Sequence, residues 1–231
     1  MKTIGMVGGI GPESTVDYYR LLIAAYRELR PDGSYPAILI NSVDLKTVLD
    51  LVAADQRSRL VEFLGGAIDA LARAGAEVGF LASNTPHLVF DEIARCSPIP
   101  LVSIVESARD HASALGLKRV GLFGTRFTMQ ASFYAHAFAE AAIEVVAPQS
   151  QEQDYIHEKY LGELVAGLVL PETRAGLLKI ARLMRVRDGI EALILGGTEL
   201  PLILRGDNDS GIPFLDTAQI HVNAVIAAAA A

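Results

Sequence analysis

An internal repeat constrains the fold of this chain more than any other feature of its sequence. Three short segments, each an apolar run that ends in small or polar residues, recur in the same order at offsets of 116, 114 and 113 residues: Ile4–Gly9 and Val120–Thr125, Phe80–Thr85 and Ile194–Glu199, Ile99–Ser103 and Ile212–Asp216. Chance supplies one such echo easily, but hardly three in order at nearly one offset. We therefore predict two similar lobes, the first made of residues 1–103 plus 217–231 and the second of residues 104–216.

Short β-branched runs alternate with longer segments of helical period along the whole chain. The expected strands are Ile4–Val7, Ala37–Val43, Val78–Ala82, Leu101–Ile104, Arg119–Phe123, Ile143–Val146, Ala192–Leu195 and Pro213–Leu215. The clearest expected helices are Pro12–Arg30, Gln56–Ala74, Ile104–Leu115 and Ala218–Ala230. Such alternation is typical of parallel sheets flanked by helices. The predicted fold class is therefore α/β, with two pseudo-symmetric Rossmann-like lobes and a ligand cleft between them.

Composition narrows the classes of partner. With 231 residues, 51% of them hydrophobic, the chain can fill one large core or two modest ones. Its 20 basic and 27 acidic residues give a formal charge of −7. An acidic chain without a basic cluster is a poor match for nucleic acid or for anionic membranes. We expect a small-molecule partner, no nucleic acid and no membrane.

The single cysteine, Cys96, excludes an internal disulfide and lacks neighbours at metal-ligand spacing. It lies between Ala94 and Pro98, in a segment expected to be a loop that precedes a strand. The apolar run at the N-terminus breaks at glycine too early for a signal sequence or a membrane span. We expect a cytoplasmic protein without a metal site.

Small polar residues follow four of the expected strands: Gly8–Gly11, Ser83–Thr85, Gly124–Thr125 and Gly197–Glu199. Ligands of parallel sheets bind at the carboxyl ends of strands, where backbone N–H groups and helix starts are available. Hydroxyl and amide groups at such ends suit a carboxylate ligand, since its oxygens need several converging donors. The alternative is that residues such as Asn84 or Thr198 only cap the next helix.

The glycine run Gly8–Gly11 also has some similarity to a dinucleotide-binding fingerprint. However, the full G-x-G-x-x-G pattern is missing, and the acidic residue Asp44 lies 33 residues beyond Gly11 rather than about 20. The sequence therefore gives little support to a nucleotide site.

Motifs over essentially the whole chain resemble those of the aspartate/glutamate racemase family: MVGGIGPEST, ASNTPH, GLFGTRFTM, GGTELPL and IPFLDTAQIH. The resemblance implies two pseudo-symmetric α/β lobes, no cofactor, and inversion of the α-carbon of an acidic amino acid by two opposed thiols, one in each lobe. It also implies a homodimer, for which the apolar helix segment 16–25 is a candidate interface. The expected activity is that of an amino-acid racemase, an isomerase of aspartate- or glutamate-like substrates.

The two thiol positions of the family motifs are occupied by Ser83 and Gly197 in this chain. The family reads Cys-Asn-Thr at the first position and Gly-Cys-Thr-Glu at the second. The resemblance thus makes Ser83 and Gly197 the catalytic positions, with Gly197 a vacated place for the second base. It implies these substrate-binding residues: Gly9, Asn84, Thr85, Thr125, Arg126, Thr128, Thr198 and Glu199. For Arg126, pairing on the surface is an equal alternative.

Removal of an α-proton needs a base on one face of the carbon and an acid on the other. A thiol can be tuned towards neutrality, whereas a serine hydroxyl titrates much higher and glycine has no side chain. Racemisation is therefore expected to be atypical or weak unless another group takes part. His87 and Glu199 are the nearest candidates in the sequence, although either could equally begin a helix facing solvent or hold a loop.

Two further interpretations stay open. One is a one-sided reaction, decarboxylation or elimination on a related dicarboxylic acid, and the other is a carboxylate-binding protein without catalysis. If Gly197 is a vacated thiol position, the space beside it should be open and a cysteine there should be tolerated.

Overall fold

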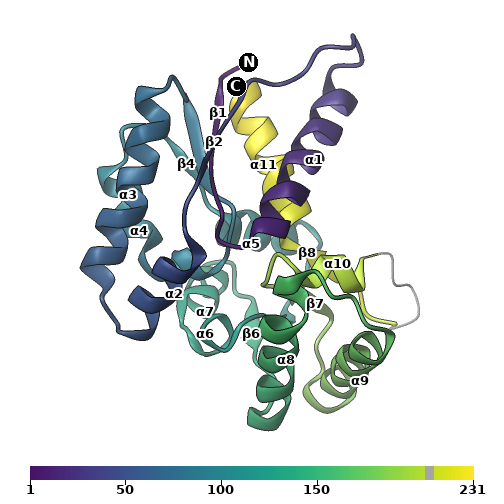
Figure 1. The fold of residues 1–231 in the computed structure, drawn as a ribbon. Coiled ribbons are helices and arrows are strands. Elements are labelled where there is room, and N and C mark those ends of the chain that lie inside the picture. The colour runs from purple at the N-terminus through teal and green to yellow at the C-terminus, as the bar shows by residue number, and fades with distance from the viewer. Residues whose placement is uncertain (206–210) are drawn as a thin grey trace. The chain divides into compact units, whose positions relative to one another are not determined.

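Two four-stranded parallel sheets form the framework of the chain (Figure 1). The computed structural model describes residues 1–205 and 211–231, which form two compact units. Unit 1 consists of Met1–Ile104 and His221–Ala231, and unit 2 of Val105–Ile220. The strand orders are equivalent, β2-β1-β3-β4 in unit 1 and β6-β5-β7-β8 in unit 2. The repeated segments of the sequence therefore fall on equivalent strands, and the predicted α/β class is confirmed.

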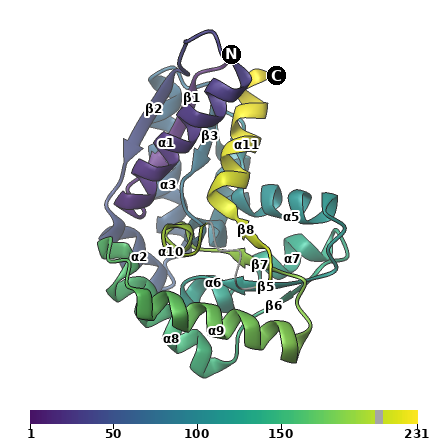
Figure 2. The same ribbon diagram turned by 90° about the vertical axis from the view of Figure 1, so that its right-hand side faces the viewer.

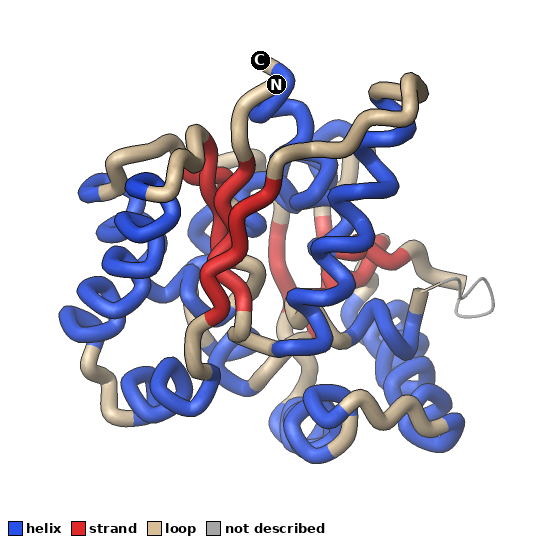
Figure 3. The backbone as a smooth tube through the Cα atoms, turned by 45° about the horizontal axis from the view of Figure 1, so that its top comes forward, coloured by secondary structure: helices blue, strands red, loops and turns tan. Residues whose placement is uncertain are grey.

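Unit 1 builds its sheet from β1 (Ile4–Gly8), β2 (Ile38–Ser42), β3 (Val78–Leu81) and β4 (Leu101–Val102). Its helices are α1 (Pro12–Leu29), α2 (Leu45–Ala53), α3 (Arg57–Arg73), the 3-10 helix η1 (Thr85–Val89), α4 (Phe90–Cys96) and most of α11 (Thr217–Ala230). Helices α3 and α4 lie on one side of the sheet, and α1 and α11 lie on the other (Figures 1 and 3). The central pair is β1 and β3, in which Val7 stands opposite Leu81.

The two faces of this sheet are packed differently. Leu64 and Ile68 of α3 are fully buried against an aliphatic cluster that includes Val7 and Leu81. On the side of α1 and α11 the rings of Tyr18, Phe80 and His221 pack together, with centroids 5.1 to 5.8 Å apart. Both faces are thus closed, as a parallel sheet requires.

His221 is fully buried and joins α1, α11 and β4 by hydrogen bonds. Its Nε2 lies 2.9 Å from the carbonyl oxygen of Val102, which can only accept, so Nε2 carries the hydrogen. Its Nδ1 then accepts from the hydroxyl of Tyr18 at 3.0 Å. Burial lowers the pKa of His221 to about 4, so the ring is neutral near pH 7.

Unit 2 builds its sheet from β5 (Arg119–Phe123), β6 (Glu144–Val146), β7 (Ala192–Leu195) and β8 (Phe214–Asp216). Its helices are α5 (Ile104–Ala114), α6 (Arg126–Gln130), α7 (Phe133–Ala139), α8 (Ser150–Gly162), η2 (Leu164–Ala166), α9 (Pro171–Asp188) and α10 (Leu200–Leu204). Figure 2 shows α8 and α9 on one side of this sheet and α5 and α7 on the other. The core on the α8 and α9 side includes Phe123, Leu193 and Leu195 of the strands.

Helix boundaries follow local chemistry. Pro12 opens α1 at its first turn, where a missing N–H costs nothing. Asp44 caps α2 by accepting from the backbone N–H groups of Lys46 and Thr47, which gives this residue a local role in place of the nucleotide contact considered above. The eight expected strands are present with small shifts; β4, for example, ends at Val102 because Ile104 already begins α5. Within residues 1–205 and 211–231, no helix is long and apolar enough to cross a membrane.

Candidate active site

In unit 1, the carboxyl end of β1 runs into a tight glycine turn. Gly9 has a φ of 83°, a conformation that side chains disfavour, and a Cβ there would lie 2.7 Å from the backbone nitrogen of Val43. The Gly9 N–H donates to the hydroxyl of Thr15 at 2.8 Å, and that hydroxyl donates to the carbonyl of Gly11 at 3.0 Å. The N–H of Gly9 is thus committed to α1, which weakens the expectation that it binds substrate.

The neighbouring strand β3 ends in the segment Ser83–Thr85. The backbone of Ala82 still donates to Val7 at 2.9 Å, so this segment lies at the same edge of the sheet as the glycine turn. Ser83, Asn84 and Thr85 are buried, with 7%, 2% and 8% of their surfaces exposed. In the described structure the Asn84 side chain makes no capping bond to η1, although it interacts with other groups. Simple helix capping therefore does not account for Asn84.

His87 lies inside unit 1 rather than at its surface. It is 7% exposed, and its ring stacks on Phe90 with centroids 4.5 Å apart. Burial lowers the pKa of His87 to about 3, against a smaller opposing effect from the backbones of Ser83 and Asn84. Of the alternatives considered for His87, the one in which it faces solvent is wrong, and a neutral, packed imidazole fits a structural role.

In unit 2, Thr125 and Thr128 form one buried hydroxyl pair at the end of β5. Thr125 caps α6 by accepting from the N–H of Thr128 at 3.3 Å, and the two hydroxyl oxygens lie 3.1 Å apart. Arg126, between them, turns outward and pairs with Asp154 at 2.7 Å with 42% of its side chain exposed. Its backbone N–H donates to Nδ1 of His157 at 3.2 Å. The guanidinium of Arg126 is thus a surface group, the alternative considered from the sequence.

Both glycines that follow β7 are closely packed, and a Cβ on either one would meet neighbouring atoms. A Cβ at Gly196 would lie 2.8 Å from the carbonyl oxygen of Phe123, the neighbouring strand to which the Gly196 N–H donates at 2.7 Å. A Cβ at Gly197 would lie 2.9 Å from both Cζ and Oη of Tyr160, and still closer to Cε2. The φ of Gly197 lies outside the left-handed region, so the obstacle is the ring alone. The expectation of open space beside Gly197 is therefore wrong.

Tyr160 also completes a buried hydrogen-bonded set at this edge. Its hydroxyl donates to Oε2 of Glu199, and the hydroxyl of Thr198 donates to the same oxygen at 3.2 Å. Tyr160, Thr198 and Glu199 are 6%, 2% and 2% exposed. Burial and the nearby carboxylate raise the pKa of Tyr160 well above its ordinary value, so the phenol stays protonated. The side chain of Thr198 therefore hydrogen-bonds to Glu199 and does not cap α10.

The structure thus brings the predicted residues together within each unit. The glycine turn after β1 and Ser83–Thr85 share one edge in unit 1, while Thr125, Thr128 and Gly197–Glu199 share one edge in unit 2. Tyr160 was missed because it lies in the interior of α8, where an aromatic residue ordinarily packs in the core. The bare glycine at position 197 was the available signal, since a missing Cβ often marks a close approach from elsewhere.

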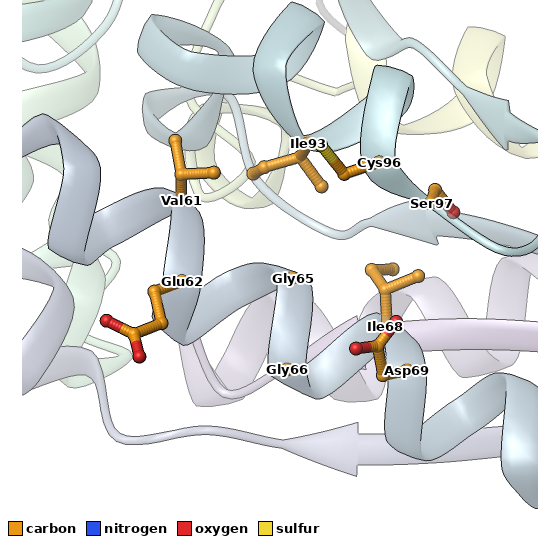
Figure 4. Close-up of a pocket in the computed structure, with 9 residues that line it drawn as sticks. All are labelled: Val61, Glu62, Gly65, Gly66, Ile68, Asp69, Ile93, Cys96 and Ser97. Atoms are coloured by element: carbon orange, nitrogen blue, oxygen red, sulfur yellow. The ribbon is translucent and has the colours of Figure 1, made fainter.

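Cys96 lies outside the strand-end segments described above. It is the last residue of α4 rather than part of a loop, and it is exposed. It lines a hollow of about 330 Å³ between α3 and α4. Figure 4 shows it beside Ile93 and across from Gly65 and Gly66. None of the residues predicted for the site lines this hollow. Among the described residues, no group of three His, Cys, Asp or Glu side chains is placed to hold a metal ion.

Comparison with known proteins places this arrangement in a family. The family model for Asp/Glu/hydantoin racemases matches residues 7–225. An aspartate racemase homologue from Pyrococcus horikoshii OT3 is 35% identical over the full length of both chains, with a TM-score of 0.86. A candidate Asp/Glu racemase from Yersinia pestis is 28% identical over both full chains, with a TM-score of 0.90.

Among curated proteins, the broad specificity amino-acid racemase RacX of Bacillus subtilis is 27% identical over 158 residues. That match covers 65% of this chain and 66% of RacX, just under two thirds of the relative. The match of the family model and of complete chains in the solved structures extends over both sheets. The chain therefore belongs to the Asp/Glu/hydantoin racemase family.

Proposed function

We propose that this chain is a cofactor-independent, racemase-type isomerase of acidic amino acids such as aspartate and glutamate, acting as a cytoplasmic homodimer. The observation that carries the substrate class is the set of buried hydroxyl and amide groups at the strand ends. In unit 1 these groups belong to Asn84 and Thr85, and in unit 2 to the Thr125 and Thr128 pair. Buried neutral donors suit ionised carboxylates, because a charged acceptor strengthens each hydrogen bond.

The two positions expected to be catalytic offer only weakly basic groups or none. Ser83, at the first thiol position of the resemblance, is a buried hydroxyl, and Gly197 at the second contributes no side chain. At neutral pH a serine hydroxyl ionises far less than a thiol, so it is a much poorer base. Slow racemisation is therefore the expected behaviour.

The test is incubation of each enantiomer of aspartate and glutamate in deuterated water. NMR follows deuterium at the α-carbon, and chiral chromatography follows inversion. Neutral and basic amino acids are included, since the name of the relative RacX indicates broad specificity. Exchange confined to acidic amino acids supports the proposal, and exchange confined to other amino acids would contradict its substrate class.

A second candidate is a one-sided reaction on a related dicarboxylic acid. The observation that favours it is the position of Tyr160, whose protonated phenol fills the space beside Gly197. A chain with a base on one face alone would exchange the α-proton of one enantiomer without producing the other. The same two assays separate this outcome from racemisation.

A further inference from the structure

The interior of unit 2 holds a carboxylate in a setting that the thiol motif does not explain. Glu199 is 2% exposed. Among the described residues, its carboxylate accepts hydrogen bonds from two neutral hydroxyl groups, those of Tyr160 and Thr198. A buried carboxylate that serves only the fold is usually paired with a cation. The setting of Glu199 therefore points to a role beyond packing.

Position in the fold supports such a role. Glu199 follows the carboxyl end of β7, the edge at which parallel sheets bind ligands. Its neighbour Gly197 carries no side chain, and the polar group in the space beside it is the hydroxyl of Tyr160. The functional groups at this strand end are thus the phenol of Tyr160, the hydroxyl of Thr198 and the carboxylate that both of them bind.

Of these groups, the carboxylate is the natural proton acceptor, because the other two are neutral hydroxyls that donate to it. The Tyr160 hydroxyl already donates to Oε2, and its raised pKa keeps it neutral. Both hydroxyl groups reach the same oxygen, Oε2. Carboxylates serve as bases for protons next to carbonyl groups when they are held at the right place. Placement is what the two hydroxyl groups supply, since each fixes the orientation of the carboxylate.

We propose that Glu199 is the base of unit 2 and that Tyr160 is its positioning residue, an assignment that rests on the proposed function. In the step assigned to Glu199, the α-proton of the substrate passes to Oε1, and the electron pair of the C–H bond stays on the α-carbon. The resulting carboxylic acid exchanges its proton with solvent and returns a proton to the same carbon. The step is balanced without any other reagent.

The two directions of a two-base reaction distinguish this role from a structural one. Each base removes the proton from one enantiomer, so loss of one base suppresses α-proton exchange from one enantiomer only. Damage to the fold lowers exchange from both enantiomers together. The ratio of the two exchange rates is therefore the quantity to measure.

The experiment compares the natural chain with Glu199→Gln and Tyr160→Phe in deuterated water, using L- and D-aspartate separately. The matched control is Tyr134→Phe, which removes the hydroxyl of another fully buried tyrosine in unit 2 that bonds to Thr217. Loss of a hydrogen bond to a charged group corresponds to roughly a tenfold change or more. We expect Tyr160→Phe to lower exchange from one enantiomer about tenfold, Glu199→Gln to lower it further, and the other enantiomer to change less than twofold.

Thermal unfolding of each variant accompanies the kinetics and establishes that it is folded. Equal losses for both enantiomers, or no loss in folded Glu199→Gln, would overturn the assignment of Glu199. If the natural chain exchanges the α-proton of both enantiomers and neither variant slows this exchange, the proposed function stands and the assignment of Glu199 falls. A natural chain that exchanges neither enantiomer of any amino acid tested would overturn both.

Discussion

The ring of Tyr160 occupies the space that a side chain at residue 197 would enter, with Cζ and Oη each 2.9 Å from the position of a Cβ on Gly197. The two residues therefore constrain each other: with the ring of Tyr160 in this place, a side chain at residue 197 would force the ring to shift. Because the φ of Gly197 is ordinary, relief of this contact alone should make a side chain acceptable.

We predict that Gly197→Cys destabilises the protein by about 1 to 3 kcal/mol, the usual cost of forcing extra atoms into a packed interior. In a Tyr160→Leu background the same substitution should cost at least about 1 kcal/mol less, since the ring is gone. Urea unfolding of the natural chain, the two single variants and the double variant measures this coupling as a double-mutant cycle. The control is Gly162→Cys on the same helix as Tyr160, where a Cβ meets nothing within 4 Å. Additive effects at residues 160 and 197 would show that the contact is unimportant.

The buried histidines of unit 1 predict a loss of stability in acid. The pKa values of His87 and His221 fall from 6.5 to about 3 and about 4 on folding. Both groups therefore bind protons more readily in the unfolded chain. The stability that depends on their being neutral is complete above pH 6.5 and declines as pH falls towards 4. Each histidine should contribute a slope of up to about 1.4 kcal/mol per pH unit in that window.

Urea unfolding between pH 7.5 and 4.5 measures these slopes. His221→Gln should reduce the slope even if it lowers stability at pH 7.5, because the variant lacks the group that titrates. His111 is exposed, and His111→Gln is the control that should leave the slope unchanged. An unchanged slope in His221→Gln would mean that His221 is not the origin of the acid sensitivity.

The fold was largely predictable from the sequence because the signals for it are local and repeated. Alternating strands and helices specify α/β, and the duplicated segments fall on β1, β3 and β4 of unit 1 and on β5, β7 and β8 of unit 2. Strand ends such as Ser83–Thr85 were found for the same reason, since they follow directly from the strand boundaries.

The packing around the strand ends was not predictable in this way. Tyr160 and Gly197 are 37 residues apart, and their contact depends on how α8 packs on the sheet of unit 2. The missing side chain at residue 197 predicts empty space, whereas a buried ring fills it. His87 and Phe90 are only three residues apart, but the burial of their stacked rings depends on how unit 1 packs around them.

The glycine pair in the middle of α3 offers a gain in stability. Gly65 and Gly66 are helical, and a Cβ on either one would meet nothing within 4 Å, because both line the hollow in Figure 4. Glycine in a helix interior costs about 0.5 to 1 kcal/mol relative to alanine. Gly65→Ala and Gly66→Ala should each raise the free energy of unfolding by about that amount.

Chemical unfolding at pH 7.5 measures the gain, and Gly176→Ala in α9 supplies the contrast. A Cβ at Gly176 would lie 2.6 Å from Cζ of Tyr155, so this variant should lose stability although it has the same gain in helix propensity. Destabilisation by Gly65→Ala would indicate that the hollow is filled in solution.

Asn84 is one of the residues proposed to donate hydrogen bonds to the substrate carboxylates. Asn84 follows β3, is 2% exposed and makes no capping bond to η1 in the described structure. If its amide binds a substrate carboxylate, Asn84→Ala should weaken the binding of aspartate by about 1 to 3 kcal/mol, the cost of leaving a charge-assisted hydrogen bond unmade. Isothermal calorimetry measures the affinity directly and needs no turnover.

Asn41 is the matched control, because its amide donates to the carbonyl of Ala67 at 3.2 Å within unit 1. Asn41→Ala should lower stability and leave the affinity for aspartate unchanged. Equal affinities in folded Asn84→Ala and in the natural chain would remove Asn84 from the site, and would leave the hydroxyl pair of Thr125 and Thr128 as the donors to test next.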